Sequence, residues 1–277
     1  MIFSEQFYQS EKKGYLNEEF RLFHIKDQTG QEFSYHYHDF HKVVIFLSGK
    51  VTYHIEGKAY HLKPRDILLV SQGAIHKPEI DPSVPYERYI FWIRGDLSMQ
   101  ELNTCFQKAT DRSFNLVRVD SAVQEHLRDL LRELENSIKN QDFGDEILSN
   151  ALFTQFMVYV NRIFLQTSAI PDRRSYSSDS QVEQLLKYIN RNLTEDLSID
   201  RLSEKFFFSK YHMMRKFKNE TGYTIHNYIT SKRLLLARSL INEGSPVIKA
   251  AQMSGFNDYT TFVRSYKKQF GNAPSHV

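Results

Sequence analysis

Residues 245–271 read SPVIKAAQMSGFNDYTTFVRSYKKQFG, two helical patterns separated by a short turn. Gly255 suits the tight turn, and Asp258 is a good N-cap for the second helix. Phe262 and Tyr266 are four residues apart, which places both on the side of that helix that faces a core. A short helix, a turn of three or four residues and a second helix form a helix-turn-helix. The stretch therefore predicts this motif.

A second unit of the same kind precedes it. SIDRLSEKF (198–206) is followed by FFS and by KYHMMRKFKNETG (210–222), with Ser209 as the N-cap. Each second helix carries an arginine six residues after its cap, Arg215 and Arg264. The second helix of this motif enters the DNA major groove, where arginine pairs with guanine and lysine contacts phosphate. The candidate DNA contacts face outward on the two helices: Ser209, Lys210, Tyr211, Met214, Arg215, Lys218, Tyr259, Thr260, Val263, Arg264 and Lys267.

The charge of the chain is divided between its two parts. Of the 36 Lys and Arg and the 33 Asp and Glu residues, 15 and 8 lie in 181–277, a net of +7, whereas 1–180 carry a net of −4. The basic part predicts an anionic partner, with nucleic acid as the first candidate and a merely solvated basic face as the alternative. The single cysteine excludes an internal disulfide, and no apolar run approaches the roughly 18 residues of a membrane helix. The start of the chain lacks the order of a secretory signal, so we expect a cytoplasmic protein.

The first 95 residues have the pattern of short strands. β-rich runs are separated by turn sequences such as SGK and EGK, and they lie at 43–47, 51–55, 59–62, 66–70 and 88–93. Short strands at about ten-residue spacing favour a sandwich or a barrel.

The middle of the chain changes to helical periodicity. An apolar stripe runs along 122–139, and a second helix is expected at 145–165. The stripe predicts either packing against the N-terminal domain itself or a self-association seam. A Pro- and Ser-rich segment then predicts a linker at 168–180, between an N-terminal domain at 1–167 and a C-terminal domain at 181–277.

The C-terminal part resembles the AraC/XylS-type transcription regulators. The resemblance rests on a specific order of residues: Gly255-Phe256, Phe262, Arg264, Tyr266-Lys267-Lys268, Phe270-Gly271 and Pro274, with Tyr228, Arg233 and Ala237 in the helix between the two units. Tyr266 stands where the family usually has Phe. The resemblance implies two subdomains joined by that helix, with recognition helices in successive major grooves on one face of the DNA. It also implies a homodimer formed through helices of the N-terminal domain.

YHYHDFHK (35–42) and SQGAIH (71–76) resemble the two cupin motifs. Metal-binding cupins use three histidines and a glutamate, and here Lys42 stands at the glutamate position. A protonated lysine repels a divalent cation, so we expect no metal and no other cofactor. Asp39 is an alternative acidic ligand, but strand alternation points it away from the two histidines that flank Tyr37.

Three interpretations stay open for His36, His38 and His76: hydrogen-bonded buried side chains, the wall of a small-molecule pocket, or a metal site. The AraC-type resemblance favours a pocket for a small-molecule effector, with sugars as the first candidates. A sugar site needs hydrogen-bonding groups on an aromatic surface. The candidate effector-binding residues are Tyr35, His36, His38, Tyr53, His76, Arg88 and Trp92. Core packing is the alternative explanation for Tyr53 and Trp92.

These patterns predict an α+β protein of two domains: an N-terminal cupin-like β-barrel (jelly roll) with helices, and an all-α C-terminal domain with tandem helix-turn-helix motifs. The predicted function is that of a sequence-specific DNA-binding transcription regulator, an activator by resemblance, that responds to an effector. Its partners would be double-stranded DNA, the effector, a second copy of the chain and RNA polymerase.

Two alternatives remain for the N-terminal domain. It could serve only for dimerisation, or the chain could be a cupin metalloenzyme, against which Lys42 and the tandem motif argue. We expect no enzymatic activity, because no nucleophile–base arrangement or phosphate-binding glycine loop is evident in the sequence.

Overall fold

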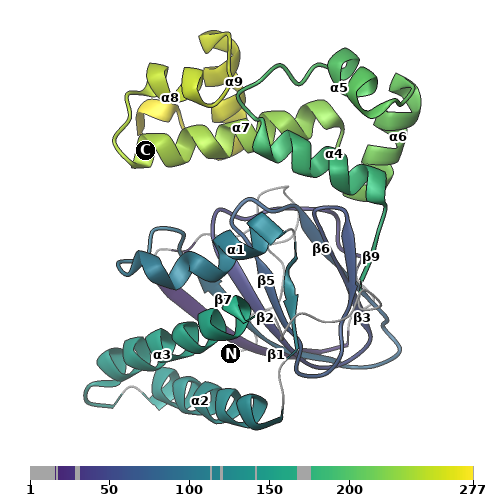
Figure 1. Cartoon of the computed structure of the whole chain (residues 1–277). Coiled ribbons are helices and arrows are strands. Elements are labelled where there is room, and N and C mark those ends of the chain that lie inside the picture. Colours follow the sequence, from purple (N-terminus) through teal and green to yellow (C-terminus); the bar gives the residue numbers. More distant parts are fainter. Residues whose placement is uncertain are drawn as a thin grey trace. The chain divides into compact units, whose positions relative to one another are not determined.

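The protein divides into two compact units, with the boundary at Ser177–Ser178 (Figure 1). The computed structural model describes residues 16, 18–28, 32–112, 114–118, 121–140, 142–166 and 176–276. Most of the predicted linker, 168–180, therefore lies outside the described residues. None of the described helices is long and apolar enough to cross a membrane.

Two β-sheets build the N-terminal unit (Figure 1). The first has the strand order β1-β7-β2-β5-β8, and the second has the order β6-β3-β4-β9. In the first sheet, β2 runs antiparallel to both of its neighbours. The strands are β1 Phe20–Asp27, β2 His41–Ser48, β3 Val51–Ile55, β4 Lys58–His61, β5 Ile67–Val70, β6 His76–Ile80, β7 Tyr86–Ile93, β8 Leu116–Val117 and β9 Tyr176–Ser178.

Side chains of the five-stranded sheet alternate between two hydrophobic cores, because successive residues of a strand point to opposite faces. On β2, Val44 and Phe46 belong to the core shared with β3 and β4, whereas Val43 and Ile45 belong to the core shared with the helices. The unit therefore has three layers: helices, the five-stranded sheet and the four-stranded sheet. The helices are α1 Thr104–Arg112, preceded by a 3-10 turn at Gln100–Asn103, α2 Ser121–Asn140 and α3 Asp145–Leu165.

The predicted combination of a sheet-rich N-terminal domain and a helical C-terminal domain is confirmed. The expected barrel differs in one respect, since the described strands form two sheets and do not close into a continuous barrel. The sequence patterns missed β1, β6, β8 and β9, the last of which lies within the predicted linker. β6 contains Pro78, which is tolerated because β6 lies at the edge of its sheet.

The apolar stripe of α2 packs within its own domain. Leu127, Leu130 and Leu134 are buried in the core formed with α3 and the outer face of the five-stranded sheet. Ile138, at the end of the stripe, is 41% exposed. Most of the stripe is therefore unavailable as a self-association seam.

The C-terminal unit contains both predicted helix-turn-helix motifs (Figure 1). α5 and α6 form the first, α8 and α9 form the second, and α7 joins them. The helices are α4 Ser180–Arg191, α5 Ile199–Phe206, α6 Lys210–Thr221, α7 Ile225–Asn242, α8 Val247–Met253 and α9 Tyr259–Phe270, followed by a 3-10 turn at Pro274–His276. Both predicted N-caps are found: the Ser209 hydroxyl accepts from the His212 amide, and the Asp258 carboxylate accepts from the amides two and three residues later.

Candidate nucleic-acid interface and effector pocket

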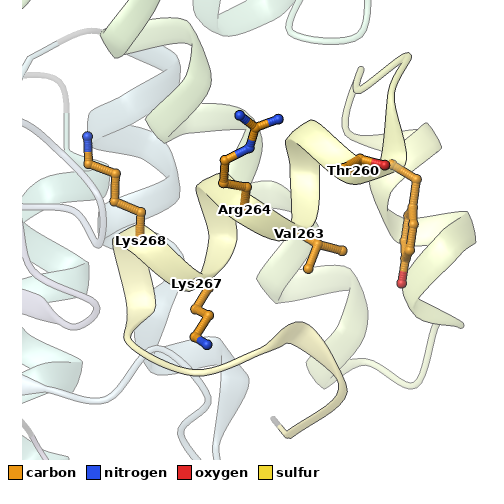
Figure 2. Close-up of a pocket in the computed structure, with 6 residues that line it drawn as sticks. Thr260, Val263, Arg264, Lys267 and Lys268 are labelled. Carbon is orange, nitrogen blue, oxygen red and sulfur yellow. The ribbon is translucent and has the colours of Figure 1, made fainter.

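α9 buries one face and leaves a basic face in solvent. Phe262 and Tyr266 pack with Leu234 and Ala237 of α7 in a hydrophobic core. The opposite side chains line an open hollow along the helix: Tyr259, Thr260, Val263, Arg264, Lys267 and Lys268. Figure 2 shows the labelled members of this set projecting from successive turns of α9.

The basic side chains of α9 are available to an external anion. Arg264, Lys267 and Lys268 are exposed, and none of them forms an ion pair with a residue that the structure describes. Among the predicted DNA contacts of α9, only Val263 is half-buried, because it also packs against the core below the helix. Val263 therefore serves at least partly as a packing residue.

α6 presents a different surface. Its predicted contacts are all exposed, but Lys210 is paired with Asp200 of α5. The guanidinium of Arg215 lies over the Tyr211 ring, 5.8 Å from its centroid. Tyr211 is 72% exposed and Met214 is 41% exposed, so α6 offers more apolar surface than α9. The two helices share an architecture but differ in the chemistry that they present.

The sequence patterns missed Phe207, in the turn between α5 and α6. Its side chain is 95% exposed, and its backbone is left-handed, with φ 55° and ψ 39°. A bulky residue in this conformation is strained, and an exposed phenylalanine gains nothing from burial. Residues that carry such strain cluster at functional sites. The run FFF at 206–208 was a usable signal, because all three rings cannot face the core of a tight turn.

In the N-terminal unit, His36, His38 and His76 lie together. Their ring centroids are 4.4 to 5.1 Å apart, and none of the three is more than 3% exposed. Burial holds the pKa of His76 well below its usual range, and the neighbouring histidines and Lys42 act in the same direction. Tyr53 stacks on His76 at 5.9 Å between ring centroids.

A small cavity lies beside this histidine cluster, between the two sheets. Its volume is about 20 Å³, and it is lined by Phe33, His36, Lys42, Val44, Tyr53, Pro78, Ile80, Tyr86, Arg88 and Ile90. This volume holds about one water molecule, whereas small-molecule sites usually measure about 300–1,000 Å³. An organic effector therefore needs these side chains to move.

The structure brings most of the predicted effector residues together. His36, Tyr53 and Arg88 line the cavity, and the other two histidines adjoin it. Trp92 lies 6.2 Å from His38 between ring centroids. Tyr35 is different, because its ring faces His54 at 6.2 Å and the Lys77 ammonium at 4.8 Å.

Arg88 has a structural role within the pocket wall. It donates to Asp27 of β1 at 2.6 Å and to the Tyr86 carbonyl at 3.1 Å, and its guanidinium lies 4.0 Å from the centre of the Tyr86 ring. The arginine is 3% exposed. Asp27 is 28% exposed, so the pair is only partly buried, but losing Asp27 would remove a carboxylate partner from a buried guanidinium. Arg88 therefore supports the fold whether or not it touches a ligand.

Comparison with known proteins matches both units. The family model of the AraC-like ligand binding domain matches residues 22–157, and that of a helix-turn-helix domain matches residues 202–277. The chain belongs to the AraC family of transcription regulators. It is therefore a DNA-binding regulator with a ligand-binding domain.

Relatives of this AraC-family protein span nearly its whole length. The transcriptional activator RhaS of Citrobacter koseri is 24% identical over 88% of this chain and 87% of its own. RhaS of Escherichia coli O139:H28 is 22% identical over 89% and 87%. Among solved structures, ToxT of Vibrio cholerae is 15% identical over 94% of this chain and 97% of its own, with a TM-score of 0.37.

Arg233 of α7 ties the two halves of the AraC-type DNA-binding unit together. Its Nε donates to the Leu193 carbonyl and its Nη2 to the Glu195 carbonyl, both at 2.7 Å. Gly255, in the turn of the second motif, packs against this junction with φ +90°. A Cβ there would lie 2.6 Å from the Leu193 oxygen and 2.9 Å from the Arg233 Nε. Only glycine fits this position without a shift of the backbone.

Proposed function

We propose that this regulator activates transcription by inserting α6 and α9 into successive major grooves of an operator. One observation carries the proposal: the two helices expose an arginine at the same offset from their caps, Arg215 and Arg264, within residues 181–277, which have a net charge of +7. The names of the relatives, which are activators, support the direction of control. Activation would further require contact with RNA polymerase, and operator DNA as the target supports a cytoplasmic location.

The two helices would divide the work of recognition. Arg264 and Lys267 have no competing ion pair among the described residues, so α9 would supply a guanine contact and a phosphate contact. Arg215 is packed on Tyr211, which orients the guanidinium, and Met214 beside it suits a thymine methyl group. α6 would therefore read a site with more apolar edges than α9.

An effector bound between the sheets would control this activity. The support is the convergence of His36, Tyr53 and Arg88 on one cavity within a ligand-binding domain of the family. Because the cavity is small, an effector of the size of a sugar must open it, and that opening gives the ligand a preference for one conformation over another. A carbohydrate is the candidate that the family resemblance suggests.

We also propose that the regulator acts as a homodimer. Near the turn between α2 and α3, Phe143 is fully exposed, Ile147 is 78% exposed and Leu148 is 42% exposed. Clustered apolar side chains of this kind are typical of an interface. Sedimentation of the Ile147→Asp variant would test this: a shift toward monomer supports the interface, and an unchanged dimer excludes it.

The decisive experiment is capture of host genomic fragments by the purified full-length chain, followed by sequencing. We expect discrete sites with paired half-sites, which are lost in an Arg215→Ala/Arg264→Ala double variant. Lys108→Ala is the control, because it removes an exposed positive charge from α1 in the other unit. If the double variant retains the same sites, the assignment of α6 and α9 as the reading helices is wrong. Repeating the capture with added sugars tests the effector separately.

A further inference from the structure

The histidine cluster has the geometry of ligands around a single point. One ring nitrogen from each of His36, His38 and His76 lies within 4.8 Å of the others, and all three side chains are buried. A tetrahedral ion with bonds of about 2.0–2.1 Å needs its nitrogens about 3.4 Å apart. Because the three nitrogens already lie within 4.8 Å of one another, none of them must approach another by more than about 1.4 Å to hold one ion.

Backbone carbonyls set the orientation of two rings. The Nδ1 of His36 is 2.8 Å from the Ser34 carbonyl, and the Nδ1 of His76 is 2.9 Å from the Ala74 carbonyl. A carbonyl oxygen only accepts, so each Nδ1 carries the proton and each Nε2 carries the lone pair. Metal-binding histidines typically make this same contact on the nitrogen opposite the metal.

The environment of the His76 Nε2 also points to a ligand. It is fully buried, and it makes no hydrogen bond with any residue that the structure describes. A buried acceptor without a partner costs about 1–3 kcal/mol, so such atoms call for an explanation. The lone pair of a neutral imidazole nitrogen suits a cation, and it does not suit an anion.

The backbone holds the cluster before any ligand arrives. His36 and His76 exchange two backbone hydrogen bonds, at 3.0 and 2.9 Å, across an isolated antiparallel bridge. His38 is two residues from His36, so strand alternation places both side chains on one side. A site of this kind is already organised, so ordering its side chains around an ion costs little free energy.

We propose that His36, His38 and His76 bind one divalent transition-metal ion in the N-terminal unit. Three nitrogen ligands suit Zn²⁺, Ni²⁺, Cu²⁺ or Fe²⁺ and disfavour Mg²⁺ and Ca²⁺. The adjoining cavity of about 20 Å³ leaves room for one further ligand such as water. This inference revises the expectation of no metal, and it does not depend on the DNA contacts or on a sugar effector.

Lys42 lowers the affinity of this site without removing its ligands. The side chain is 5% exposed and lines the same cavity, with its ammonium 6.0 Å from the centre of the Tyr53 ring. The charge of Lys42 disfavours a positive charge on His76, so it would also repel a divalent ion held there. We therefore expect the Lys42→Met variant to bind the ion about tenfold or more tightly than the natural chain.

The test is metal binding by the full-length chain, produced without a polyhistidine tag and stripped with chelator. Zn²⁺ is titrated by calorimetry, and Co²⁺ is added as a probe whose visible absorption reports ligation by nitrogen. We expect one ion per chain, with at least about 100-fold weaker binding in His76→Gln. His61→Gln is the matched control, because His61 is an exposed histidine of the same unit.

Two outcomes decide the proposal. Tight binding in the natural chain and in His61→Gln, weak binding in His76→Gln and a gain in Lys42→Met support the site. The higher metal affinity of Lys42→Met cannot arise from unfolding. It therefore remains a valid test even if the His76→Gln variant does not fold. No stoichiometric binding in either the natural chain or Lys42→Met would overturn the proposal. DNA capture is measured with the same preparations. If they retain operator fragments but bind no metal, the metal site is wrong and the regulator assignment stands.

Discussion

Replacing Gly255 with alanine should loosen the joint between the two helix-turn-helix motifs. The residue has φ +90°, and the added Cβ would lie 2.6 Å from the Leu193 oxygen and 2.9 Å from the Arg233 Nε. Neither neighbour moves freely, since one is backbone and the other donates to that same oxygen at 2.7 Å. Either the backbone of the turn must shift, or the hydrogen bond from Arg233 to the Leu193 carbonyl must weaken.

The expected loss of stability has two parts. A non-glycine residue in the left-handed region costs about 1–2 kcal/mol. Weakening a hydrogen bond to a charged guanidinium costs about 1.5–3 kcal/mol more. We therefore expect the Gly255→Ala variant to lose about 2.5–5 kcal/mol of unfolding free energy in the C-terminal unit. Gly244→Ala is the matched control, because Gly244 has φ +91° and its Cβ would meet nothing within 4 Å. The Gly244→Ala variant should lose only the about 1–2 kcal/mol of unfolding free energy that comes from the left-handed backbone.

Hydrogen exchange read by mass spectrometry is the suitable assay. The only tryptophan, Trp92, lies in the N-terminal unit, so its fluorescence does not follow the C-terminal helices. Peptides from α7, α8 and α9 should exchange faster in Gly255→Ala, and operator affinity should fall with them. Equal losses in the two glycine variants would refute the reasoning, because the contacts around Gly255 would then carry none of the cost.

Further variants test the other assignments. Lys267→Ala should weaken binding to all DNA sequences and reduce the slope of log K against log salt concentration by about 1. Arg264→Ala should reduce the operator-binding free energy by about 1–3 kcal/mol and relax specificity at one base pair. Filter binding to a series of operator variants and salt concentrations separates the two effects. Phe207→Gly should stabilise the C-terminal unit by about 1–2 kcal/mol, through release of left-handed strain, yet weaken operator binding if the ring touches DNA. Burial lowers the pKa of His41 from 6.5 to about 3, so its contribution to stability is complete above pH 6.5 and is lost as pH falls toward 3. Denaturant midpoints followed by Trp92 fluorescence should decline over that range, and His41→Gln should flatten the decline.

The C-terminal unit could be predicted closely because its signals are local. N-caps such as Ser209 and Asp258 act within three residues, and the stripe of Phe262 and Tyr266 repeats within one turn. Such features are visible in a short window of sequence. What the window does not show is competition for a side chain, such as the pairing of Lys210 with Asp200.

The candidate effector pocket could be predicted only in part, because its shape depends on pairing between distant strands. Alternation places His36 and His38 on one face, but His76 joins them only through the bridge that pairs it with His36. Arg88 was predicted as a ligand group, and its partner Asp27 belongs to β1, a strand that the sequence patterns missed. The side chains that suggest a binding site therefore contact one another, and these contacts leave a cavity of only about 20 Å³. Any effector larger than an ion or a water molecule must displace these contacts, so part of its binding energy goes into a rearrangement of the domain. That cost is also what makes a response possible, because a ligand that binds without displacing anything has no preference between two conformations.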